Sequence, residues 1–384
     1  MNRSDNSSNN NESFNRFLNY SSILILFRGV SISINKNKKL FCIQFLFFVI
    51  AILRICREFY YIFYKKWNNG NVFKMTSDTI WLLEVSSVTT FLFIKRKKIV
   101  ELAEPLFDSL DFLSKNKLTK QSLYFSLAGV VYLTVNGMLF YVDRLVENKN
   151  PLYRTGTVIL SLLESPSNDV VMGACSVYFI FLRLLYVHSK IVLFHVQRKL
   201  VMLPVKRSLV RMESGQRLDS SYDNLYKVVS QSVDSMKEFD RTFSFLPFIT
   251  IMKNFLNASY IVISLLRGTT VRLIAICINN VVHNTILILI ITYLTRQRVH
   301  LENKSLMIRT AILEDKQSQR EAPVLLSLLI ESIKEMYSFQ MTGWEMFALH
   351  KSLILAFMAN VISFTVLFVQ LTVNSNSGNS TAHN

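Results

Sequence analysis

Polar side chains recur inside long apolar segments of this 384-residue chain, and they mark its candidate chemistry. An ionisable or amide group in such a segment is unfavourable unless it is paired, hydrated or bound to a ligand. The alternative is that these groups bond one helix to another. As a set they favour a water-filled pocket that offers hydrogen bonds and aromatic faces to a small molecule. Its predicted lining is Trp81, Glu84, Asn136, Tyr141, Asn168, Asp169, Asn257, Tyr260, Asn279 and His283.

The last apolar segment carries a second pattern, made of Asn360, Ser363, Leu367 and Gln370. Their spacing of i, i+3, i+7 and i+10 places all four on one stripe of a helix. The remaining positions are nearly all apolar, so a single thin polar stripe runs along this helix. Such a stripe fits a helix that faces its symmetry mates around a water path, which requires several subunits. A polar seam within one bundle is the alternative.

Motifs for metal binding, phosphate binding and nucleophilic catalysis are missing from the sequence. None of the six histidines falls in an H-E-x-x-H arrangement, and no P-loop, G-x-G-x-x-G or G-x-S-x-G is present. With only ten glycines, the chain has few residues for loops that cradle phosphates. Nothing in the sequence therefore argues for an enzyme, and no metal or cofactor is expected.

Composition places the chain among membrane proteins. Hydrophobic residues make up 51% and charged residues only 18%, and the apolar ones cluster in blocks of about twenty. Blocks of this length match a hydrocarbon core about 30 Å thick at 1.5 Å per helical residue. The net charge of +17 lies mainly between the apolar blocks, which indicates contact with anionic lipids rather than nucleic acid.

Seven helical spans are predicted, which makes the fold class all-α and polytopic. Their approximate bounds are Phe41–Phe63, Asp78–Ile94, Leu123–Val142, Asn168–Val187, Ser244–Leu266, Leu273–Leu294 and Ser352–Leu371.

The distribution of basic residues predicts the orientation. Of the Lys and Arg residues outside the predicted spans, 30 lie on the side of the N-terminus and 8 on the other side. Because basic loops stay in the cytosol, the N-terminus is expected inside and the C-terminus outside. This topology exposes the sequon at Asn379 to glycosylation.

The predicted organisation divides the chain into five parts. Residues 1–40 form a cytosolic segment whose first twenty residues are rich in Asn and Ser and expected to be disordered. Residues 41–300 form the ligand-binding bundle with helical cytosolic extensions, and 301–349 form a cytosolic anchor that includes an amphipathic helix near 322–340. Residues 350–371 form the pore-lining helix, and 372–384 form an extracellular tail.

The C-terminal fifth resembles the insect gustatory receptor family. The family pattern in the last helix is Thr-Tyr, five mostly apolar residues, then Gln-Phe. This chain has Ser363-Phe364, five residues, then Gln370-Leu371, so the spacing and the glutamine match. The upstream segment from Phe339 to Gly343 is similar to the family's Phe-x-x-x-Gly.

The resemblance implies a ligand-gated cation channel related to insect odorant receptors, assembled as a homo- or hetero-tetramer. Such a channel would detect small-molecule tastants in the plasma membrane of sensory neurons and depolarise the cell. By position, Gln370 and Leu371 would form the outer gate, with Ser363 lining the path below. A G-protein-coupled receptor would need an external N-terminus, against the charge distribution. A transporter of duplicated halves would need an internal repeat, which the sequence lacks.

Overall fold

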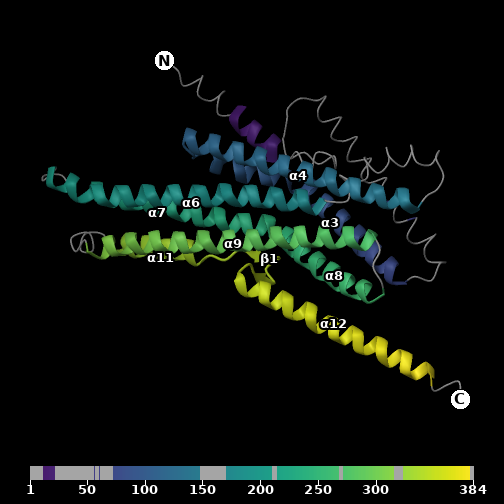
Figure 1. Cartoon of the computed structure of the whole chain (residues 1–384). Coiled ribbons are helices and arrows are strands. Elements are labelled where there is room, and N and C mark those ends of the chain that lie inside the picture. The colour runs from purple at the N-terminus through teal and green to yellow at the C-terminus, as the bar shows by residue number, and fades with distance from the viewer. Residues whose placement is uncertain are drawn as a thin grey trace.

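Long helices packed side by side make up the computed structural model of the chain (Figure 1). It describes residues 12–21, 56, 60, 72–147, 170–209, 214–267, 271–314 and 323–380. A short helix covers residues 12–21. The labelled elements are α3 (Val72–Asp108), α4 (Phe112–Glu147), α6 (Val170–Leu209), α7 (Ser214–Phe243), α8 (Phe245–Arg267), α9 (Val271–Glu314), α11 (Pro323–Ser338), β1 (Thr342–Gly343), β2 (Phe347–Ala348) and α12 (Lys351–Ser380).

The predicted spans from the second to the seventh lie in helices α3, α4, α6, α8, α9 and α12. The first, Phe41–Phe63, lies outside the described residues apart from Cys56 and Tyr60. Helix α12 does not end at Leu371 but continues to Ser380, so most of the predicted tail is helical.

Four helices are much longer than a bilayer core requires. Helices α3, α4, α6 and α9 have 37, 36, 40 and 44 residues. At 1.5 Å per residue they extend about 54–66 Å, against about 30 Å of hydrocarbon. The helical extensions predicted from the sequence are therefore present, as continuations of the same helices.

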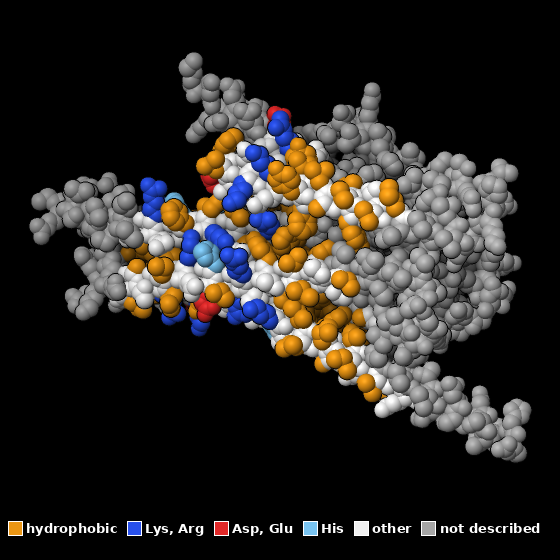
Figure 2. All heavy atoms as spheres, viewed as in Figure 1, with side chains coloured by type: hydrophobic (Ala, Val, Ile, Leu, Met, Phe, Trp, Pro, Cys, Tyr) orange, Lys and Arg blue, Asp and Glu red, His pale blue; other side chains and the backbone are white. Residues whose placement is uncertain are grey.

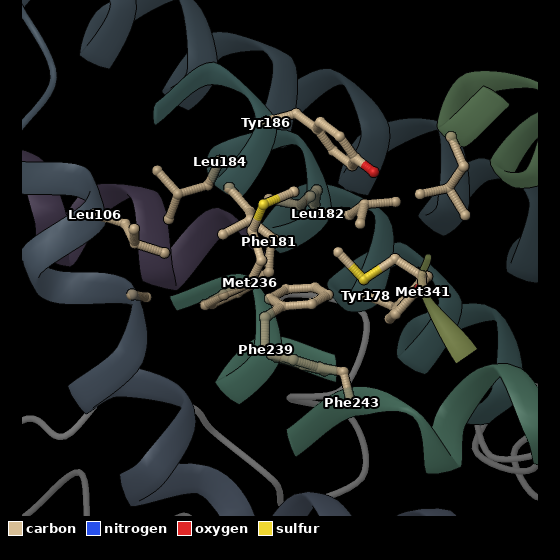
Figure 3. Packing of buried hydrophobic residues seen from close by; sticks show 14 of the residues in the cluster. Leu106, Tyr178, Phe181, Leu182, Leu184, Tyr186, Met236, Phe239, Phe243 and Met341 are labelled. Atoms are coloured by element: carbon tan, nitrogen blue, oxygen red, sulfur yellow. The ribbon is translucent and has the colours of Figure 1, made fainter. Parts of the chain in front are cut away.

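Helix α6 lies at the centre of the bundle, in contact with α3, α4, α7, α8 and α9. Among the described residues, one stretch is long and apolar enough to cross a membrane, the 27 residues Ala174–Leu200. Tyr178 and Phe181 on this helix meet Phe239 and Phe243 of α7 in a buried aromatic cluster, with ring centroids about 5–6 Å apart (Figure 3).

Helix α4 presents an apolar stripe to the outside of the bundle. The helically spaced residues Tyr124, Leu127, Val131, Val135 and Met138 are all about half exposed or more. A long exposed apolar face is unfavourable in water and is the expected surface of a helix against lipid. Figure 2 shows hydrophobic side chains gathered in a broad band over this part of the molecule.

Helix α7 differs from α4 because most of its described hydrophobic residues are buried against neighbouring helices. It packs against α11, which buries Leu326, Leu329, Ile333 and Met336 at helical spacing, as the sequence predicts. Ion pairs at the rim tie α7 to its neighbours, with Lys237 Nζ 2.5 Å from Glu335 on α11 and Lys98 of α3 2.5 Å from Glu238.

The prediction of disorder in the first twenty residues is wrong for residues 12–20. Residues 12–21 form a helix that buries Phe14, Phe17 and Leu18. The Phe17 ring lies 5.0 Å from Phe107 and 5.7 Å from Phe181. These three apolar residues at i, i+3 and i+4 outweigh the polar composition around them, because they bury their area in the main core.

Candidate functional site

The helices α7 and α8 run on from one another with a break at Ser244. Pro247 explains the break, because proline has no N–H to donate to the carbonyl of Phe243. The carbonyl of Ser244 accepts a hydrogen bond from the N–H of Trp344, at 2.9 Å, on the segment that leads into α12. The same carbonyl also accepts from the N–H of Phe248, at 3.4 Å, so it bonds both to α8 and to a distant part of the chain.

A two-stranded hairpin joins α11 to α12. Its pairs are Thr342 with Ala348 and Gly343 with Phe347, and the N–H of Met346 donates to the Gly343 carbonyl at 3.0 Å. Trp344 and Glu345 at the turn have positive φ values of 48° and 58°. These are unusual for residues with a side chain, and such strain persists only where surrounding contacts hold it.

Contacts of Trp344 hold this turn. Its ring meets Phe245 and Phe248 of α8 edge-on, with centroids 5.7 and 5.0 Å away. Gly343 packs so closely that an added Cβ would lie 2.3 Å from the ring of Phe347. Because Phe347 also lies over Phe248, the hairpin is seated on the first turn of α8.

The carboxylate of Asp240, on the last turn of α7, holds the hairpin against α7 by hydrogen bonds. It accepts hydrogen bonds from the backbone N–H of Thr342 at 2.8 Å and from the Thr342 hydroxyl at 2.6 Å. We call this pair of bonds the clasp. The N–H bonds to Oδ1 and the hydroxyl to Oδ2, and bonds to an ionised carboxylate are stronger than bonds between neutral groups.

Opposing effects set the pKa of Asp240. Burial raises the pKa of this carboxyl above its ordinary value, the two hydrogen bonds from Thr342 lower it, and the charge of Glu345 raises it again. Burial dominates, so the clasp is formed by a carboxyl that binds its proton more tightly than a free aspartate does.

Helix α12 extends from this hairpin away from the rest of the bundle (Figure 1) and contacts α8 and α9. Its bundle-facing side is half-buried and includes Phe357, whose ring lies 6.3 Å from Phe255 of α8. At about 100° per residue, the exposed remainder divides into two faces. One carries Leu355, Met358, Ile362 and Val366, all at least half exposed.

The other exposed face of α12 is the predicted polar stripe. Asn360, Ser363, Leu367 and Gln370 are exposed in the single chain. The side chain of Leu371 lies outside the described residues. Two exposed faces of different polarity on one helix are expected when one faces lipid and the other faces water or further copies of the chain.

The predicted pocket residues are distributed over several helices. Helix α3 carries Trp81 and Glu84, α4 carries Asn136 and Tyr141, α8 carries Asn257 and Tyr260, and α9 carries Asn279 and His283. The side chains of these eight residues lie outside the described part of the structure, as do Asn168, Asp169 and the Asn379 side chain. The predicted pocket and glycosylation site thus remain predictions.

The sequence does not identify the clasp residues as partners. Asp240 and Thr342 are 102 positions apart, and neither belongs to a recognisable motif. The one signal in the sequence is the Phe339–Gly343 segment, which carries part of the gustatory resemblance and leads directly into the hairpin.

Known structures share this arrangement of helices. Olfactory receptor OR5 of the insect Machilis hrabei, in complex with eugenol, aligns with a TM-score of 0.66 and 11% identity, over 92% of this chain and 97% of that one. A second structure of OR5 aligns with a TM-score of 0.63 and 12% identity over the same shares. No protein-family model matches the sequence, and no curated protein matches it.

The likeness shows the fold. The chain shares the all-α fold of the insect olfactory receptor OR5, in agreement with the all-α fold class that the sequence predicts. The alignment covers nearly all of both chains, so the match extends well beyond the C-terminal fifth that carries the sequence resemblance.

Proposed function

We propose that this protein is a gustatory receptor of the insect type, a ligand-gated cation channel that opens when a small-molecule tastant binds. One observation carries the proposal. The polar stripe of α12 is exposed beside a separate exposed apolar face, on a chain with the insect olfactory receptor fold. A monomeric bundle would leave that stripe against lipid, where unpaired amides are unfavourable.

Assembly of four copies would remove the polar stripe of α12 from contact with lipid. In a ring with α12 innermost, Asn360, Ser363 and Gln370 would face a central water path, and Ile362 and its neighbours would face lipid. Gln370 and Leu371 would form the outer gate, and the side-chain amide would offer both a donor and an acceptor to a hydrated cation. The plasma membrane of a sensory neuron is the proposed location, with an internal N-terminus.

The tastant would bind in the outer half of the bundle, among the ten polar and aromatic residues predicted from the sequence. Amides, acids and rings together suit a small molecule with both hydroxyl groups and an apolar body. Eugenol, with which OR5 forms a complex, is a small molecule with one hydroxyl group and a largely apolar body, which supports a small and mainly apolar ligand but not its identity.

The clasp supplies a route from pocket to gate. Helix α8 carries two of the predicted pocket residues, and its first turn holds the hairpin from which α12 begins. A displacement of α8 on ligand binding would therefore move the base of α12 through Trp344 and the Asp240–Thr342 bonds.

Current recordings with a matched pair of variants test the proposal. The chain is expressed alone and with related receptors in cells that lack them, and a panel of tastants is applied. Gln370→Ala should change cation selectivity or the open fraction. Ile362→Ala, on the apolar exposed face of the same helix, should leave both unchanged. Failure of a surface-expressed chain to conduct with any partner or ligand would refute the channel.

Glycosylation mapping tests the orientation separately. If the C-terminus is external, Asn379→Gln should remove a sugar-dependent shift in electrophoretic mobility. Acceptor sequons placed in the connection between α6 and α7 should remain unmodified. Modification there would reverse the proposed topology.

A further inference from the structure

A cavity between α6 and α9 is lined by basic and amide side chains. Its volume is about 360 Å³, and its lining consists of Lys190 from α6 with Arg296, Gln297, Val299, His300 and Asn303 from α9. Residues 296, 300 and 303 recur at helical spacing, so one face of α9 supplies most of the wall. This volume lies within the range of small-molecule sites.

The charges around this cavity repel one another. Burial is the largest cause of a lowered pKa at His300, and the positive charges of Lys190, Lys304 and Arg296 lower this pKa further. The ammonium of Lys304 lies 5.8 Å from the ring centre of Phe194 on α6. Figure 2 shows Lys and Arg side chains gathered around a histidine on one face, beside the hydrophobic band.

Acidic residues do not compensate these charges within the described part of the chain, where no ion pair involves Lys190, Arg296 or Lys304. Elsewhere in the bundle cations are paired, as Lys98 is with Glu238. Unpaired, converging cations beside a cavity favour a bound anion.

Gln297, a further lining residue, requires a hydrogen-bond donor in the ligand. The residue is only 7% exposed, and its Oε1 atom has no hydrogen-bond partner among the described residues. A buried carbonyl oxygen without a donor is unfavourable, and an ionised phosphate oxygen cannot supply that donor. A ligand that carries hydroxyl groups beside its phosphates would satisfy both Gln297 and the cations, once the Gln297 side chain turns its Oε1 atom, which is buried in this structure, toward the cavity.

The cavity lies at the depth expected for lipid headgroups. Arg296 is two residues beyond the predicted end of its span at Leu294, and Lys190 is three beyond Val187. At 1.5 Å per residue, both lie about 3–5 Å outside the hydrocarbon, within the headgroup layer. The basic loops place this end of the bundle on the cytosolic side, where the inner leaflet contains anionic lipids.

We infer that the cavity between α6 and α9 binds a phosphorylated polyol of the inositol phosphate class, with Lys190, Arg296 and His300 on the phosphates and Gln297 on a ring hydroxyl. The same chemistry is offered by a phosphoinositide headgroup in the inner leaflet and by a soluble inositol phosphate. The inference uses the fold and the cavity, and does not require that the protein conducts ions.

Binding to the full-length protein tests the inference. The purified chain in detergent is titrated with dioctanoyl phosphatidylinositol 4,5-bisphosphate, inositol 1,4,5-trisphosphate and dioctanoyl phosphatidylcholine, using native mass spectrometry at two salt concentrations. Both inositol compounds should bind, more weakly at high salt, and phosphatidylcholine should not. If the phosphoinositide binds more tightly than inositol trisphosphate, the natural ligand is a membrane lipid. If both bind equally, the natural ligand is the soluble inositol phosphate.

Matched variants place the ligand. Lys190→Gln with Arg296→Gln should weaken binding at least tenfold, since two charge-assisted contacts are lost. Arg198→Gln, a charge removal at an exposed position two turns further along α6, should have little effect. Gln297→Leu should weaken binding of inositol trisphosphate more than binding of inorganic pyrophosphate, which has no ring hydroxyl. Unchanged melting temperatures would show that the variants fold.

Two results would overturn the inference. One is no binding of either inositol compound by the folded wild type. The other is equal weakening by Arg198→Gln and by the double variant, which would indicate a diffuse charge effect. Since no current is measured, either result leaves the proposed channel function untouched.

Discussion

The hydroxyl of Thr342 should fasten the hairpin at the base of α12 to α7. Thr342→Val removes the 2.6 Å bond from this hydroxyl to Asp240 and the longer 3.3 Å bond that the hydroxyl accepts from the N–H of Glu345. It keeps the shape of the side chain and the 2.8 Å bond from the backbone N–H of Thr342 to Asp240. A hydrogen bond to a charged group contributes about 1.5–3 kcal/mol. Local opening of the hairpin should therefore become roughly 10- to 100-fold more frequent.

Hydrogen–deuterium exchange of the detergent-solubilised protein measures this opening directly. Peptides that cover residues 339–349 should exchange roughly 10- to 100-fold faster in the valine variant than in the wild type. Peptides from the buried part of α6 should keep wild-type exchange, because the clasp lies at the periphery of the core. The amide hydrogens of Thr342 and Leu349, both hydrogen-bonded in the native state, are the most informative.

Thr342→Ser is the matched control, because it keeps the hydroxyl and removes only a methyl group. Wild-type exchange in the serine variant and fast exchange in the valine variant would support the clasp. The reasoning is refuted if the hairpin exchanges at the wild-type rate in the valine variant, or if both variants accelerate equally. Acceleration throughout the chain would mean that Thr342 acts on global folding instead.

Three further predictions concern the same junction. Gly343→Ala should lower the melting temperature of the purified protein, because the new methyl group would lie 2.3 Å from the Phe347 ring and overpacking costs about 1–3 kcal/mol; an unchanged melting temperature would contradict this packing. Glu345→Gly should stabilise the hairpin and slow its hydrogen exchange about fivefold, since glycine relieves about 1 kcal/mol of left-handed strain at a φ of 58°. Because burial raises the Asp240 pKa, stability from this group should be highest in acid and fall as pH rises from the ordinary carboxyl pKa to the raised one. Asp240→Asn should flatten that part of the unfolding free energy curve, and a curve of unaltered slope would show that Asp240 does not titrate as described.

Local patterns in the sequence are sufficient to locate most helices. Apolar blocks of about twenty residues locate α3, α4, α6, α8, α9 and α12, because hydrophobic length follows directly from bilayer thickness. The helical spacing of Leu325, Leu326, Leu329, Ile333 and Met336 likewise predicts an amphipathic helix near 322–340, where α11 lies.

Composition misleads where only a few residues bury a helix. Asn and Ser dominate the first twenty residues, yet Phe14, Phe17 and Leu18 fold residues 12–21 onto Phe107 and Phe181. The average over a window hides three well-spaced residues, and their partners lie far along the chain. Such pairing is decided by tertiary packing, which a one-dimensional pattern does not contain.

The sequence by itself determined that the chain forms apolar helices and that α12 carries a polar stripe, and it predicts that the basic loops lie mainly on one side of the membrane. These are properties of spacing and charge along one segment. The tertiary structure alone decided that this stripe is exposed, that Asp240 holds Thr342, and that Lys190 shares a cavity with Arg296. Each of these depends on which helices become neighbours, and neighbours are chosen by packing over distances of about a hundred residues.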